Sequence, residues 1–157
     1  MDGAAKAKIL EVLAGQRILT VATLRPDGWP QATIVGYAND GLTVYFICGR
    51  ESQKAANIAR DNRISIAIGG DTPDPMAITG LSMAARAAPV TDPTEIAKFA
   101  QLMYARYPEY KSMPAPDMSQ IHVMRVVPEV ISLLDYTKGF AHTDLFTVSG
   151  AEIRQAA

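Results

Sequence analysis

The sequence predicts a mainly β protein with peripheral helices, built as a six-stranded antiparallel split β-barrel. Short runs of β-branched and aromatic residues alternate with tight turns rich in Gly, Pro, Asn and Asp. Only three segments are expected to be helical: one precedes the first predicted strand, and the other two stand between predicted strands. No repeat, low-complexity run or change of composition divides the 157 residues. The chain is therefore expected to form a single domain over residues 1–157, with its helices outside a closed or nearly closed barrel.

The chain is expected to begin with a helix over residues 1–16. Ile9, Leu10 and Leu13 fall on one helical face, and Gly15 is a suitable C-terminal cap.

A meander of three strands should follow the first helix, over residues 17–24, 31–38 and 42–47. The first turn, Arg25-Pro26-Asp27-Gly28, combines a proline that presets the backbone with a glycine that tolerates positive φ. The second turn, Asn39-Asp40-Gly41, is typical of a tight hairpin.

The middle of the chain predicts a short helix between strands. Ser52 is a good N-cap for a helix over residues 53–61. The apolar residues 64–68 predict a buried fourth strand. Residues 76–90 predict a long fifth strand with a bend or bulge near Gly80.

The last helix has a clear start signal. Asp92, Pro93 and Glu95 are placed as N-cap, first helical residue and capping-box partner, so a helix should run to about Arg106.

The final predicted strand is interrupted by proline. Residues 121–127 form a sixth strand that continues over residues 130–136, with Pro128 at an edge or a bulge. The remainder, residues 137–157, shows no clear period and is expected to be a C-terminal tail.

The composition excludes several classes of protein. Fifteen Lys and Arg against sixteen Asp and Glu leave a net charge of −1, whereas neutralising nucleic-acid phosphates needs a cationic excess. The longest uncharged segment, residues 28–39, is shorter than the roughly 20 residues of a membrane helix. The N-terminus has no apolar signal-peptide core. We therefore expect a cytoplasmic protein that binds neither nucleic acid nor membrane.

No metal site is expected. Cys48 is the only cysteine, which excludes an intrachain disulfide and a four-thiolate zinc site. The two histidines, His122 and His142, do not stand at a metal-ligand spacing, and neither a Gly-x-Ser-x-Gly elbow nor a P-loop is present.

The segment that joins the third strand to the second helix could bind an anion. It carries Gly49, Arg50, Ser52 and Lys54 around a helix N-terminus, where unpaired backbone N–H groups and the helix dipole favour negative charge. A hydroxyl and two cations suit a phosphate. The alternative is an ordinary capping serine beside two solvated cations.

Several motifs of the first 68 residues occur in a specific order and spacing. They are Leu19-Thr20-Val21-Ala22-Thr23, Pro26-Asp27-Gly28-x-Pro30, Val44-Tyr45-Phe46, Gly49-Arg50-x-Ser52-x-Lys54 and Asn57-Ile58-x-x-Asp61-x-Arg63-Ile64-Ser65. With these motifs the chain resembles the FMN-binding split barrels of the pyridoxamine 5′-phosphate oxidase-like superfamily. A weaker resemblance extends over residues 84–91 and 135–143.

The resemblance implies an FMN-binding flavoprotein, related to pyridoxamine 5′-phosphate oxidase and of the oxidoreductase class. Ser52 and Lys54 would hold the flavin phosphate. Gln53 stands where many members have an arginine, and Arg50 is expected to compensate for that cation.

The resemblance also assigns two strands to the cofactor. Backbone groups of the second strand would face the flavin ring, at Ala32, Thr33, Ile34 and Val35. The Thr33 hydroxyl could reach the pyrimidine edge of the ring. Phe46 and Ile47 would approach the ribityl chain or the phosphate. The chain would form a homodimer with shared cofactor sites.

One departure bears on the substrate. Residues 148–157 lack the Arg-Leu-x-Pro-type segment with which the oxidases bind their substrate phosphate. We therefore expect a relative that acts on a different small molecule. Alternative cofactors are the deazaflavin F420 and haem, with His142 as the axial ligand, and a third alternative is a binding or sensing module without turnover.

Overall fold

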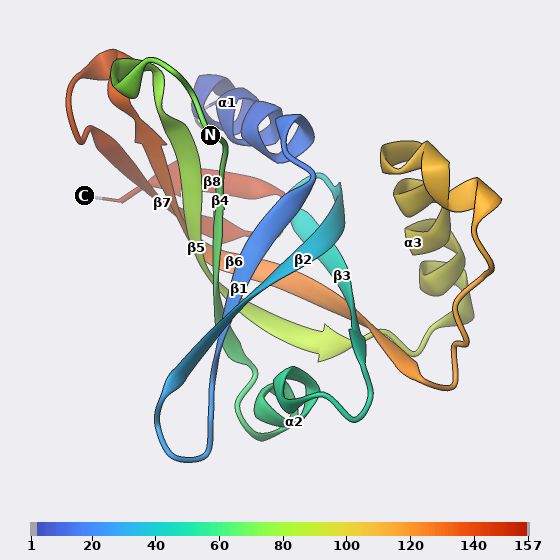
Figure 1. The fold of residues 1–157 in the computed structure, drawn as a ribbon. Coiled ribbons are helices and arrows are strands. Elements are labelled where there is room, and N and C mark those ends of the chain that lie inside the picture. Colours follow the sequence, from blue (N-terminus) through green and yellow to red (C-terminus); the bar gives the residue numbers. More distant parts are fainter. Residues whose placement is uncertain (1–2, 157) are drawn as a thin grey trace.

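The computed structural model describes residues 3–156 and confirms the predicted split barrel (Figure 1). The strands are β1 (Ile18–Leu24), β2 (Pro30–Asp40), β3 (Thr43–Gly49), β4 (Arg63–Gly69), β5 (Thr79–Pro89), β6 (Ile121–Asp135), β7 (Thr143–Ser149) and β8 (Glu152–Gln155). The α-helices are α1 (Gly3–Gly15), α2 (Gln53–Arg60) and α3 (Pro93–Arg106), and three short 3-10 helices are η1 (Pro75–Ala77), η2 (Pro108–Ser112) and η3 (Tyr136–Lys138).

Six antiparallel strands close the barrel. The sheet runs in the order β3-β2-β1-β4-β5-β6-β7-β8. An additional pairing between β3 and β6 closes the first six of these strands into the barrel, and β7 and β8 extend the sheet beyond it. Alternate residues of β1 and β4 are buried and exposed, as expected for a barrel with one packed face. The barrel core includes Val21, Phe46, Ile66, Met83 and Val126.

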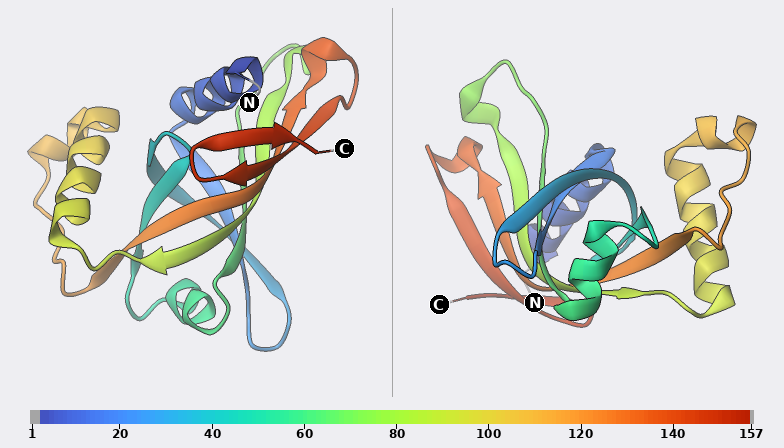
Figure 2. Two further views of the ribbon diagram at one scale, coloured as in Figure 1. Left: turned by 180° about the vertical axis from the view of Figure 1, so that it is seen from behind. Right: turned by 60° about the horizontal axis from the view of Figure 1, so that its bottom comes forward.

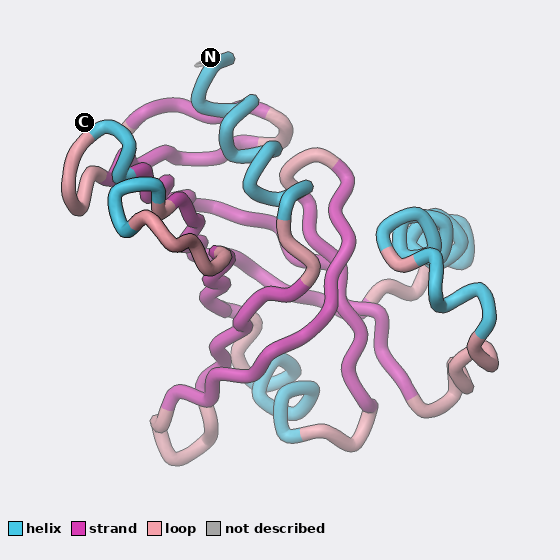
Figure 3. The backbone as a smooth tube through the Cα atoms, turned by 45° about the horizontal axis from the view of Figure 1, so that its top comes forward, coloured by secondary structure: helices cyan, strands magenta, loops and turns pink. Residues whose placement is uncertain are grey.

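The helices occupy three different positions around the barrel. Ile9 and Leu13 of α1 pack into the core at one end, and α2 lies at the other end (Figures 1 and 3). α3 stands to one side, where Phe99 and Met103 form a second cluster with Tyr45 and its neighbours on the outer face of β2 and β3 (Figure 2).

The tail contains a β-hairpin that the sequence analysis did not predict. β7 pairs with β6 and β8 pairs with β7, next to β6 in the left view of Figure 2. The hairpin turns at Gly150, which has a φ of 60°. Alternation in β7 is hidden in the sequence, because Asp144 takes a half-buried position that an apolar residue usually fills.

Two predicted strands differ in detail from the structure. β5 begins only at Thr79, because the Asp74 carboxylate accepts from the Met76 N–H (2.9 Å) and caps η1 over residues 75–77. β6 is continuous from Ile121 to Asp135, and its pairing with β5 shifts register beside Pro128, where a bulge was expected.

β2 and β3 separate at one end, and this opening positions the candidate site. β2 pairs with β1 over residues 30–36 but with β3 only over residues 37–40. β3 in turn pairs only with β6 over residues 47–49. Each strand therefore has a length of unpaired edge, and the two edges diverge toward α2 (Figure 1).

Within residues 3–156, no helix is long and apolar enough to cross a membrane.

Candidate functional site

The N-terminus of α2 presents hydrogen-bond donors at the open end of the barrel. The Ser52 hydroxyl accepts from the Ala55 N–H (3.2 Å) and donates to the Gly49 carbonyl (2.7 Å), so Ser52 is the predicted N-cap. The backbone N–H groups of Gln53 and Lys54 lie in the first turn, where a helix offers them no acceptor of its own. This end of the helix can therefore bind an anion.

α2 is held in place by a polar anchor. Asn57 is 0% exposed, and its amide donates to Thr23 Oγ1 (2.9 Å) and Gln31 Oε1 (3.2 Å). Gln53 donates to Asn57 Oδ1 (2.9 Å). Gln53 thus fastens the anchor. Asn57 was not predicted as an anchor, because nothing in a single sequence distinguishes a buried asparagine from a surface one on a helix.

Lys54 is a half-buried cation without an acidic partner among the described residues. Its ammonium lies over the ring of Phe46, 5.7 Å from the centroid. Burial lowers the pKa of Lys54, because desolvation penalises the charged form. Phe46 is 0% exposed, so its side chain supports Lys54 from within the core and has no open surface of its own.

The unpaired edge of β2 presents backbone groups next to this helix end. The Tyr107 hydroxyl lies between the Arg17 carbonyl and the Tyr37 backbone, and the Tyr37 N–H donates to it (3.0 Å). Tyr37 therefore turns its backbone polar groups toward the β1 side. Because these directions alternate along a strand, the N–H and C=O groups of Ala32 and Ile34 point to the open edge.

Thr33 and Val35 project into the barrel, whereas the side chains of Ala32 and Ile34 are exposed on its outer face. The Thr33 hydroxyl is buried without a hydrogen-bond partner. It lies one same-face step, roughly 7 Å, from Gln31, which contacts α2 through Asn57. Since buried polar atoms are nearly always paired, this hydroxyl indicates a missing partner.

Two predicted site residues point elsewhere. Arg50 Nη2 approaches the Met118 carbonyl (3.4 Å), on the segment that follows η2. Ile47 lies on the outer side of β3, where it lines a cavity beneath α3. The structure therefore groups Ser52, Gln53, Lys54 and the β2 edge, and places Arg50 and the Ile47 side chain outside that group.

His142 is at the opposite end of the molecule. It lies in the segment between η3 and β7, and this segment is at the upper left of Figure 1, whereas α2 is at the bottom. Its Nε2 lies 3.1 Å from the Asp144 carboxylate, which also accepts from Lys138 (2.8 Å). Lys138, and to a lesser extent His142, hold the pKa of Asp144 below its ordinary value. Within a single chain, His142 therefore does not lie near Ser52 and Lys54.

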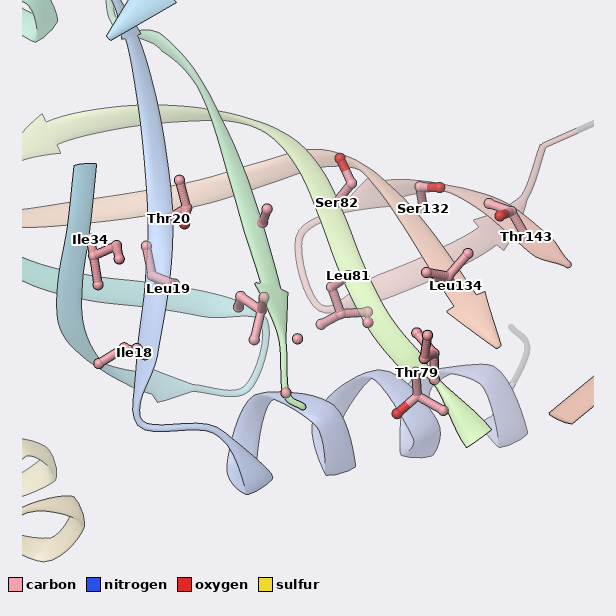
Figure 4. A pocket seen from close by; sticks show the side chains of 16 residues that line it. Ile18, Leu19, Thr20, Ile34, Thr79, Leu81, Ser82, Ser132, Leu134 and Thr143 are labelled. Atoms are coloured by element: carbon pink, nitrogen blue, oxygen red, sulfur yellow. The ribbon is translucent and has the colours of Figure 1, made fainter. Parts of the chain in front are cut away.

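Part of the outer face of the sheet forms a cavity whose lining has no charged side chain, although it includes several serine and threonine hydroxyls. This shallow cavity of about 460 Å³ runs from Ile18 and Ile34 to Leu81, Leu134 and Thr143 (Figure 4). Ile34 is 69% exposed and Ile18 is 54% exposed. Neither Ser52 nor Lys54 lines this cavity.

The donor set fits a phosphate monoester and not a metal ion. Two free N–H groups and a lysine are ligands for anionic oxygen. No group of three or more His, Cys, Asp or Glu side chains comes together in residues 3–156. Cys48 is buried, and burial raises the pKa of its thiol.

Comparisons with known proteins agree with the fold. The fold resembles a conserved hypothetical protein, Rv2991, from Mycobacterium tuberculosis, with a TM-score of 0.72, 28% identity and 92% of each chain covered. It also resembles a haem-binding protein from Mycobacterium smegmatis (TM-score 0.78, 23% identity), covering 94% of this chain but only 59% of that one.

A further structural neighbour is the haem storage protein HutZ from Vibrio cholerae (TM-score 0.66, 19% identity), over 78% of this chain and 89% of HutZ. No curated protein sequence matches the chain. The model of the family described as pyridoxamine 5′-phosphate oxidase matches residues 5–135. The chain therefore belongs to the pyridoxamine 5′-phosphate oxidase family.

Proposed function

We propose that this protein binds FMN and uses it as an oxidoreductase of small organic molecules. The observation that carries the proposal is the set of unpaired donors at the N-terminus of α2, in a chain of this family. FMN would supply the hydride or electron transfer, so the protein needs to provide binding, orientation and a suitable electrostatic environment.

Each part of the site has a distinct role in this proposal. Lys54, Ser52 and the first N–H groups of α2 hold the phosphate. The Thr33 hydroxyl, which the resemblance placed at the pyrimidine edge of the ring, is buried and faces the barrel interior, so it is not assigned to the phosphate. The backbone groups of Ala32 and Ile34 bind polar atoms of the ring along the open β2 edge. Arg50 is not part of the phosphate site, because its guanidinium approaches Met118.

A second copy of the chain would complete the site. The β2 edge and the α2 end form one side of a binding site, and the exposed apolar face beside them needs a cover. We propose that two copies pair through this face. Ile34→Lys should give a monomer in light scattering and lose FMN, whereas Ala105→Lys, on the exposed face of α3, should leave both unchanged. A monomeric parent protein would contradict the pairing.

The cofactor is tested by comparing FMN with riboflavin, which has the same ring but no phosphate. Titration of the apoprotein, followed by flavin fluorescence, should show FMN binding at least tenfold more tightly. Equal affinities would place the phosphate away from α2. If the protein binds neither flavin but binds F420 or haem, the proposed cofactor is wrong, whereas the fold assignment still holds. Reduction of bound flavin by NADH or NADPH without oxygen would separate an enzyme from a binding module.

Haem is the second candidate cofactor, and one observation favours it. Asp144 lies 3.1 Å from His142 Nε2, and a carboxylate next to a histidine commonly orients a metal-ligating imidazole. Two neighbours in fold are named as haem-binding and haem storage proteins. A haem complex with a Soret band that shifts in His142→Ala would support this alternative. An unchanged spectrum in that variant would exclude His142 as the ligand.

A further inference from the structure

A second cavity lies beneath α3, on the outer side of β3. Its volume is about 410 Å³, which is within the range of small-molecule sites. Its walls are apolar and aromatic: Ile47 comes from β3, Phe99, Met103 and Tyr104 from α3, and Met113 and Met118 from the following segment. No charged side chain lines it.

The segment over residues 113–118 forms the outer wall and leaves apolar side chains partly exposed. Met113 is 58% exposed and Met118 is 43% exposed. Pro114 and Pro116 fix two φ angles in this wall, so the segment cannot easily collapse onto α3. Methionine side chains adapt to the shape of a ligand, and sulfur contacts aromatic rings favourably.

One cation stands at the Met118 end of the cavity. Arg50 Nη2 is 3.4 Å from the Met118 carbonyl, and Arg50 forms no ion pair with the described residues. A planar guanidinium can pair with a carboxylate through two hydrogen bonds. The cavity itself is therefore uncharged, and one positive group, Arg50, lies outside it next to the Met118 wall.

We propose that this cavity binds a planar apolar carboxylate of one or two fused rings, with the ring system among the methionines and the carboxylate at Arg50. The site adjoins the proposed FMN site, since Arg50 precedes Ser52 by two residues, but neither Ser52, Lys54 nor any residue of β2 lines it. Ile47 faces the cavity on the outer side of β3, whereas its neighbour Phe46 faces the core and Lys54. The enclosed volume favours a small molecule over a protein partner, which would need a broader surface.

The probe for the first experiment is 2-naphthoate, added to the full chain labelled with ¹³C at the methionine methyl groups. Met103, Met113 and Met118 line the cavity, whereas Met83 and Met124 lie in the barrel core and serve as internal references. We expect saturable shifts at the three cavity methyl groups and none at the two references. No saturation at millimolar 2-naphthoate, or shifts confined to other methyl groups, would overturn the proposal.

The second experiment tests the cation. Arg50→Gln should weaken 2-naphthoate about tenfold and leave the affinity for neutral 2-naphthamide unchanged, because only the carboxylate loses a charge-assisted pair. Lys111→Gln, an exposed cation of η2, is the matched control for general electrostatic attraction. Equal losses in the two variants, or no loss in either, would overturn the role of Arg50.

The third experiment fills the cavity. Ala100→Phe projects a ring into it from α3, and Ala115→Trp does so from the exposed segment. Because Ala115→Trp leaves every helix intact, it tests the proposal even if Ala100→Phe disturbs α3. Each should abolish binding of 2-naphthoate while FMN affinity stays within threefold of the parent. Unchanged 2-naphthoate binding in both variants would overturn the site, independently of whether FMN binds.

Discussion

The two ends of the barrel carry similar side chains and use them differently. At the η3 end, Lys138 and His142 converge on the Asp144 carboxylate, so their hydrogen-bonding capacity is directed within the chain. At the α2 end, Lys54 lies on an aromatic ring, and no acid of the described residues pairs with it. A cation with an internal partner stabilises the fold, whereas one without a partner is available to a ligand.

The difference follows from where the chain places its acids. Asp61 is the acid just beyond α2, and Arg63 binds it (2.7 Å), so it is directed away from Lys54. The neutral polar groups of α2 are also used, since Asn57 and Gln53 anchor the helix. The helix N-terminus and Lys54 are left without an acidic partner, with the exposed Glu51 just before the N-cap, and an incoming phosphate can use both donors.

Asn57→Ala should have the largest effect on the α2 end. It leaves the buried Thr23 hydroxyl without its donor and removes the side-chain hydrogen bond from α2 to Gln31. We expect a loss of about 2–4 kcal/mol in the free energy of unfolding, together with weaker FMN binding. Urea denaturation followed by circular dichroism measures the first effect and flavin titration the second.

The matched control for that variant is Asn62→Ala. Asn62 is exposed, and its side chain accepts only from Arg86 (3.0 Å). Loss of the Asn62 side chain should change the free energy of unfolding by no more than about 0.5 kcal/mol. Equal effects of the two substitutions would show that α2 is not held by Asn57.

Lys54→Ala should change binding and leave the fold intact. Loss of a charge-assisted hydrogen bond should weaken FMN by about 1.5–3 kcal/mol, roughly ten- to a hundredfold. Riboflavin affinity should stay the same, so the preference for FMN should disappear. Lys8→Ala is the control, since Lys8 pairs with Glu11 on the surface of α1. A variant that keeps its preference for FMN would contradict the comparison between the two ends.

The barrel was predictable from sequence because the signals that specify its strands and helices are local. Alternating side chains, glycine turns and the capping residues Ser52 and Asp92 specify elements without reference to the rest of the chain. The β7–β8 hairpin was not found, since Asp144 interrupts the apolar pattern and its partners Lys138 and His142 become neighbours only in the fold.

The candidate site was predictable only in part for the same reason. A helix N-terminus with Ser52 and Lys54 can be recognised in sequence, but the partners of a long side chain cannot. Arg50 and Lys54 are equivalent cations in the sequence, and the fold turns one to Met118 and the other over Phe46. The open edge of β2 depends on where β3 leaves it for β6, which is a property of the closed barrel.

Asp144→Asn should have the smallest effect on the free energy of unfolding. The pH dependence of this effect identifies it with the charge of the carboxylate. Because Lys138 and His142 lower the pKa of Asp144 in the folded protein, the carboxylate stabilises the fold above its ordinary pKa of 3.8. That contribution is lost as the pH falls through the lowered folded pKa. The variant should therefore be less stable than the parent at pH 7, by up to about 1 kcal/mol, and the two should converge below pH 3. Urea denaturation across this range measures the difference, and Lys138→Ala should reduce it. A difference that stays constant with pH would show that the Asp144 charge contributes nothing and that the η3 end does not hold its cations internally.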